Sequence, residues 1–157
     1  GNMNAISYKE VFKMIKENKL WLGVSPRGMN FRLPDNSLKN VNACWFTNLE
    51  HKKRKEEIIL WKTYNENHFE RYDNYDAINI DKVTEIPKDY KGAMGVPITF
   101  LDKYNPNQFE ILGCDYDVKD GLLPQLINKK WNGKFDRGYI KGKRLYSRLL
   151  IKAKNLP

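Results

Sequence analysis

The side chains that could carry acid–base or metal chemistry are few and scattered. His51 and His68 are the only histidines of the chain, and each lies among charged or polar neighbours. The segment YDNYDAINID supplies Asp73, Asp76 and Asp81, which could gather a metal only if the segment folded back on itself. The two cysteines form no CxxC pair, so neither a disulfide framework nor a zinc site is predicted. These residues favour solvated side chains over an independent hydrolase or nuclease centre, which stays the weakest alternative.

A basic cluster is the more informative feature. The stretch WFTNLEHKKRKEEIILW contains four consecutive cations between an aromatic pair and an apolar run: Lys52, Lys53, Arg54 and Lys55. Such a cluster is either a contact surface for a polyanion or the solvated turn between two strands. A second cluster, near the end of the chain, contains Lys141, Lys143, Arg144 and Arg148.

The net charge of +9 is unevenly distributed along the 157 residues. Residues 1–62 carry a net charge of +6, residues 63–118 carry −6, and residues 119–157 carry +9. Two basic ends that flank an acidic middle are expected of a nucleic-acid binder whose cationic surface faces phosphates. The alternative is a basic interaction module that docks on an acidic protein partner.

The length and the hydropathy pattern limit the class of protein. With 41% hydrophobic residues, the chain is long enough for one packed domain, and we predict a single domain over residues 1–157 with no internal boundary. No apolar run approaches the roughly 20 residues that cross a bilayer. The first residues also lack the pattern of a secretory signal, so we expect a cytoplasmic protein without a membrane partner.

The chain is predicted to be mixed α/β, with one amphipathic helix followed by several strands. Ser7 and Glu10 fit a capping box. The helical face that follows is formed by Tyr8, Val11, Phe12 and Ile15. Asn18 suits the end of this helix, and a strand is predicted over Leu20–Val24.

The remaining elements are predicted from turn formers and β-favouring runs. Because Pro26 and Pro34 exclude a central strand, Ser25–Ser37 is predicted to be a loop. Further on we predict a hairpin of Val41–Leu49 with Ile58–Tyr64, a strand at the end of Tyr72–Ile80, a short helix over Ile98–Tyr104, a strand over Phe109–Gly113 and a final basic hairpin over Gly138–Lys152.

Four phrases of the chain carry a resemblance to a known family. They are GNMNAISYKEVFKMIKENKLWLG, WFTNLEHKKRKEEIILWK, YDNYDAINIDKVTEIPKDYKGAMGVPITFLDKYNPNQFEILG and GKRLYSRLLIK. In this order they resemble the second half of the EcoRI-type adenine-specific DNA methyltransferases. The resemblance implies methyl transfer from S-adenosylmethionine to the amino group of an adenine that is rotated out of duplex DNA. It also implies the carboxy-terminal part of a Rossmann-like methyltransferase fold, with a mixed sheet.

The chain departs from the family pattern in its catalytic motifs. It contains no Pro-Pro pair and no FxGxG-like loop, which the family uses to hold the target amino group and the cofactor. We therefore expect a carboxy-terminal portion, from a truncated gene or a cut chain, that binds no cofactor and does not methylate DNA alone. Its expected partners are double-stranded DNA and the catalytic amino-terminal half. Open sheet edges also predict a homodimer in isolation.

The resemblance assigns both basic clusters to DNA phosphates. Phosphate contacts position a protein on the duplex, whereas base edges specify the sequence. Polar side chains in predicted loops are the candidates for base contact: Arg27, Asn30, Arg32, Asn105, Asn107 and Gln108. Arginine suits guanine, and asparagine or glutamine suits adenine.

Overall fold

The computed structural model describes residues 5–6, 8–24 and 28–154. The chain forms two compact units, Gly1–Arg54 and Lys55–Pro157. The single domain over residues 1–157 stays a prediction. The predicted mixed α/β class is confirmed.

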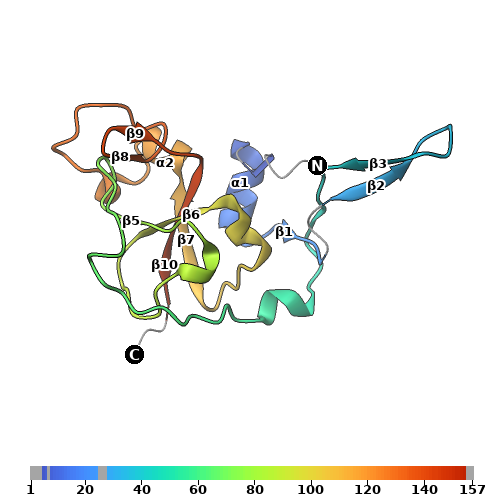
Figure 1. Cartoon of the computed structure of the whole chain (residues 1–157), viewed down its shortest axis with the longest axis horizontal. Coiled ribbons are helices and arrows are strands. Elements are labelled where there is room, and N and C mark those ends of the chain that lie inside the picture. Colours follow the sequence, from blue (N-terminus) through green and yellow to red (C-terminus); the bar gives the residue numbers. More distant parts are fainter. Residues whose placement is uncertain (1–4, 7, 25–27, 155–157) are drawn as a thin grey trace. The chain divides into compact units, whose positions relative to one another are not determined.

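In the described part of the first unit, the α-helix α1 is accompanied by two small antiparallel strand pairs (Figure 1). Strand β1 pairs with β4, and β2 pairs with β3. A 3-10 helix over Lys52–Lys55 follows at the boundary between the units. The bounds are α1 Lys9–Lys16, β1 Trp21–Leu22, β2 Met29–Arg32, β3 Leu38–Val41 and β4 Phe46–Thr47.

Helix α1 confirms the predicted amphipathic segment. Phe12 and Ile15 are buried and Val11 is half-buried, whereas Tyr8 is exposed at the start of the helix. The predicted capping residue Ser7 lies outside the described residues. The helix ends in a Schellman motif: Asn18 takes a left-handed φ of 58°, and its N–H donates to the Ile15 carbonyl over 3.0 Å.

Two predictions for the middle of the chain are wrong. Ser25–Ser37 is not entirely a loop, because β2 forms between the two prolines. It pairs with β3 in a separate two-stranded sheet. The predicted hairpin of Val41–Leu49 with Ile58–Tyr64 does not form either. Strand β4 pairs instead with β1, through the partners Trp21 with Thr47 and Leu22 with Phe46.

The second unit contains a four-stranded mixed sheet in the order β5-β6-β10-β7. Strands β5 and β6 are parallel, and β10 runs antiparallel to both of its neighbours. The strand bounds are β5 Ile78–Asn79, β6 Met94–Pro97, β7 Phe109–Cys114 and β10 Arg148–Ala153. The apolar run Leu149–Ile151 is fully buried in the central strand, as expected for a strand that is covered on both faces.

A close contact of Tyr72 and several short helices flank this sheet. Tyr72 lies so close to Gly95 in β6 that a Cβ there would come within 2.1 Å of the Tyr72 hydroxyl oxygen, so this position requires glycine. The predicted helix after Pro97 is present as a 3-10 helix. The bounds are α2 Asp115–Lys119 and 3-10 helices Val83–Glu85, Ile98–Asp102 and Pro124–Leu126.

The predicted final hairpin is present only at its start. Strand β8, Tyr139–Ile140, pairs with β9, Lys143–Arg144, around a two-residue turn. The rest of the predicted hairpin belongs to β10, because its apolar residues enter the central sheet. Among the residues that the structure describes, no helix has the length and apolar character of a membrane span.

Candidate nucleic-acid interface

The first basic cluster divides into an inward-facing arginine and outward-facing lysines. The Arg54 side chain is 7% exposed, and its guanidinium carbon lies 3.7 Å from the centroid of the Trp21 ring. Its two terminal nitrogens contact the Glu50 carboxylate, at 3.0 Å, and the Asn18 side-chain oxygen. Arg54 therefore stabilises the first unit and supports the 3-10 helix, whereas Lys52 is exposed to solvent.

Removing the Arg54 side chain should test this supporting role. We expect Arg54→Ala to lower the free energy of unfolding by about 2 kcal/mol, because it removes the cation–π contact of a buried guanidinium and its charge-assisted hydrogen bond to Glu50. The matched variant Lys52→Ala should change it by less than about 0.5 kcal/mol. Urea unfolding followed by tryptophan fluorescence measures both. Equal stability of the two variants would contradict this assignment.

The other two lysines of the cluster keep their side chains near the surface. Lys55 is exposed, and Lys53 is half-buried with its Nζ 3.5 Å from the Val24 carbonyl oxygen. His51, which precedes the cluster, places its Nε2 2.9 Å from the Leu22 carbonyl oxygen. The histidine therefore has a structural partner in the first unit.

The hairpin β8–β9 carries the two lysines of the second basic cluster, Lys141 and Lys143. Its turn residues, Lys141 and Gly142, have φ angles of 50° and 78°, the left-handed pair that a tight hairpin of this length requires. The Asp73 carboxylate accepts hydrogen bonds from both turn N–H groups, at 3.1 and 2.8 Å. Lys141 and Lys143 are thereby held exposed at the tip of a fixed turn.

Arg144 is exposed but already paired. Its Nε and a terminal nitrogen lie 3.2 and 3.1 Å from the Asp136 carboxylate, which also accepts a hydrogen bond from the Tyr139 hydroxyl. Desolvation by burial works against ionisation of Asp136, but the bonds from Tyr139 and Arg144 outweigh it and lower the pKa of Asp136. Arg144 therefore carries less unbalanced charge than the two lysines.

Arg148 is buried, although the sequence analysis predicts it to be a phosphate-contacting residue of the second basic cluster. It is 8% exposed, its Nε donates to the Asn79 side-chain oxygen over 3.2 Å, and a terminal nitrogen lies 3.7 Å from Asp81. The Tyr72 hydroxyl donates to the same Asn79 oxygen over 2.7 Å, and burial raises the pKa of Tyr72. The Arg148 side chain thus anchors β10 to β5.

The buried carboxylate of Asp115 fixes the start of β10. The Asp115 oxygens accept hydrogen bonds from the Tyr75 hydroxyl, at 2.7 Å, and from the Arg148 N–H, at 3.0 Å. Burial raises the pKa of Asp115, although these two hydrogen bonds act in the opposite direction. Asp115 joins α2 to the central strand through contacts that the sequence alone does not reveal.

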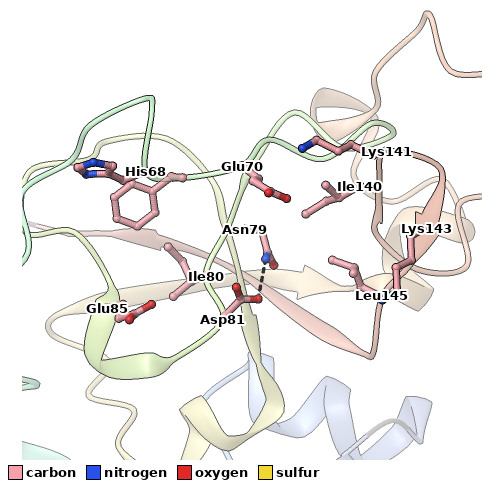
Figure 2. A pocket seen from close by; sticks show the side chains of 11 residues that line it. His68, Glu70, Asn79, Ile80, Asp81, Glu85, Ile140, Lys141, Lys143 and Leu145 are labelled. Carbon is pink, nitrogen blue, oxygen red and sulfur yellow. Dashed lines mark hydrogen bonds between the residues drawn. The ribbon is translucent and has the colours of Figure 1, made fainter.

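The hairpin lysines also line a pocket with a volume of about 530 Å³. Figure 2 shows Lys141 and Lys143 on one side of this pocket and His68 and Glu85 on the other. Within the described ranges, no three His, Cys, Asp or Glu side chains are placed to hold a metal ion.

The structure places the candidate base-contacting residues differently. Asn107 is exposed, and its backbone N–H donates to the Asn105 side-chain oxygen over 2.9 Å. Arg27 lies outside the described residues, whereas Asn30 and Arg32 are exposed on β2. Gln108 instead accepts from the Ile58 N–H and donates to the Ile58 carbonyl oxygen, both over 2.8 Å. Asn105 is buried and donates to the Glu56 carbonyl oxygen over 3.3 Å, so both of these side chains fasten the chain near residues 56–58.

Comparison with known proteins identifies the family. The family model described as adenine-specific methyltransferase EcoRI matches residues 1–154. The chain belongs to this family. Its relatives include the Type II methyltransferase M.EcoRI of Escherichia coli, at 42% identity over 99% of this chain and 49% of the relative. Another is M.MpnI of Mycoplasma pneumoniae, at 35% identity over 97% of this chain and 54% of the relative.

This member of the adenine-specific methyltransferase EcoRI family spans about half the length of the curated relatives it matches. A third Type II methyltransferase, M.MgeORF184P of Mycoplasma genitalium, is 34% identical over 97% of this chain and 55% of the relative. No solved structure matches the chain.

Sequence reasoning missed two residues on the strand opposite Asn30 and Arg32. Lys39 and Asn40 lie in β3, and the Asn40 amide nitrogen donates to the Asn30 side-chain oxygen over 2.9 Å. The signal was present in the turn formers PDNS, which separate the segments MNFRL and LKNV as in a hairpin. In this family member, the candidate polar surface of the first unit is therefore a strand pair.

Proposed function

We propose that this chain is the DNA-contacting, carboxy-terminal portion of a site-specific adenine methyltransferase of the restriction–modification type, acting in the cytoplasm. The observation that carries the proposal is the family match over residues 1–154. In the complete enzyme, S-adenosylmethionine would supply the methyl group. The catalytic amino-terminal half would hold the cofactor, and this chain would hold duplex DNA and complete a Rossmann-like sheet.

The described residues do not fit a cofactor cradle. Strands β5 and β6 form the only parallel pair among the strands that the structure describes. The segment between β5 and β6, residues 80–93, contains one glycine, Gly92, and the Tyr90 ring occupies the space beside it. Strand β6 is followed directly by a 3-10 helix. A phosphate- or cofactor-binding turn needs glycine where the backbone approaches the ligand. In this proposal the cofactor therefore binds to the catalytic half.

Exposed cations support contact with DNA phosphates. Lys52, Lys55, Lys141 and Lys143 are exposed, and the last two lie on a hairpin whose turn is fixed by Asp73. In this proposal the buried Arg54 and Arg148 hold the elements that carry these lysines. Lys53 and Arg144 contribute less because other protein groups engage their side chains.

The sheet edges suit association with the catalytic half. Strand β7 lies at one edge of the four-stranded sheet and is six residues long. The unpaired N–H and C=O groups of an edge strand form a template for another strand. We propose that β7 pairs with the catalytic half in the complete enzyme and that isolated chains form a homodimer through the same edge.

Titration of a labelled DNA duplex with the full chain tests the proposed function. We expect saturable binding at low salt, because lysine contacts to phosphates release counterions. With S-adenosylmethionine added, we expect no methyl transfer by the chain alone. Absence of DNA binding at low salt would overturn the DNA-contacting role, and methyl transfer by the chain alone would overturn the division of labour between the halves.

A further inference from the structure

The antiparallel pair β2–β3 forms an isolated two-stranded ribbon within the first unit (Figure 1). Its register pairs Asn30 with Asn40 and Arg32 with Leu38 on one face, and Met29 with Val41 and Phe31 with Lys39 on the other. Met29 is half-buried, and the other seven strand residues are exposed. A ribbon that buries neither face makes little contribution to a core, so its side chains are available for a partner.

The polar face of the ribbon presents a defined pattern of hydrogen-bonding groups. The Asn40 amide nitrogen donates to the Asn30 side-chain oxygen over 2.9 Å. This bond leaves the Asn30 NH₂ as a donor and the Asn40 carbonyl as an acceptor, side by side. Adenine offers the complementary pair in the major groove, the N7 acceptor and the N6 donor. Arg32, two residues from Asn30 on the same face, has the fork of donors that suits guanine N7 and O6.

The charge and size of the ribbon also suit duplex DNA. The only charged strand residues are the cations Arg32 and Lys39. The turn between the strands contains Asp35, whose carboxylate accepts hydrogen bonds from the Ser37 N–H and hydroxyl at 2.9 and 2.5 Å. Paired strands lie about 4.8 Å apart, and the major groove, about 12 Å wide, admits a two-stranded ribbon.

We propose that the β2–β3 ribbon enters the major groove of duplex DNA and reads base edges with Asn30, Arg32 and Asn40. The asparagine pair would select adenine, and Arg32 would select guanine. This inference rests on the proposed function, since it assigns base reading to a chain proposed to hold DNA. The base-contacting residues would then come from both strands of the ribbon.

Selection of bound sequences from a random duplex library by the full chain tests this assignment. Wild type should enrich sequences with a fixed guanine and a fixed adenine. Arg32→Gln should lose preference at the guanine, and Asn30→Ala with Asn40→Ala should lose it at an adenine, each by about tenfold to a hundredfold. The control Lys39→Gln removes the same charge from the opposite face and should keep both preferences.

The outcomes separate the two proposals. If wild type binds duplex DNA without base preference, or if the Arg32 and asparagine variants retain the wild-type preference, base reading by the ribbon is overturned while DNA binding stands. If wild type does not bind the library at low salt, the proposed function itself fails. All substituted side chains are exposed, so circular dichroism should show an unchanged fold for each variant.

Discussion

Asp115→Ala is expected to lower the free energy of unfolding by about 3 kcal/mol, since it leaves two buried donors without an acceptor. These donors are the Tyr75 hydroxyl and the Arg148 N–H, which lie 2.7 and 3.0 Å from the Asp115 oxygens. Tyr75 is 1% exposed, so water cannot replace the lost partner without a rearrangement of the core. Urea unfolding of the two proteins measures the difference.

The pH dependence gives an independent test of the same contact. Because burial raises the pKa of Asp115 in the folded state, its stabilising contribution is fully present below the unfolded pKa. This contribution declines as the pH rises through the folded pKa. The stability difference between wild type and Asp115→Ala should therefore shrink from about pH 4 towards pH 7. A difference that grows over this range would contradict the assigned direction.

Replacing four exposed lysines by glutamine should weaken DNA binding by about a hundredfold at moderate salt. The substituted residues are Lys52, Lys55, Lys141 and Lys143, all exposed on the two basic clusters. Each lysine that contacts a phosphate contributes close to one unit to the slope of log affinity against log salt. We therefore expect the variant to have a slope that is shallower by about four units, measured by fluorescence anisotropy.

A matched control separates local contacts from net charge. The acidic middle segment, residues 63–118, contains four exposed lysines: Lys82, Lys88, Lys91 and Lys103. Their replacement by glutamine removes the same total charge, but we expect the slope to stay close to that of wild type. Equal losses in the two variants would show that only the net charge matters and would contradict the assigned phosphate contacts.

Local patterns in the sequence predict the elements that depend on neighbouring residues. The spacing of Val11, Phe12 and Ile15 identifies α1, and the run FEILG after the turn Asn105–Gln108 identifies β7. The basic hairpin turn at Lys141 and Gly142 is also predicted, because the strands that it joins are adjacent in the chain. Such signals require no knowledge of distant partners.

Pairings and contacts between distant segments are not predicted. Strand β4 pairs with β1 across more than twenty residues, and no turn signal marks this pairing. The burial of Arg54 and Arg148 also depends on distant groups: Trp21 and Asn18 for the first, Asn79 and Asp81 for the second. In a basic chain these arginines look like any other surface cation until their partners are known.

The salt dependence of duplex binding by the wild-type chain tests the central claim most directly. If this chain is the DNA-contacting part of an adenine methyltransferase, log affinity should fall linearly with log salt, with a slope of about −0.9 for each phosphate contacted. Four contacting lysines predict a slope of about −3.6 or steeper. A flat salt dependence, or no binding at low salt, would contradict the account.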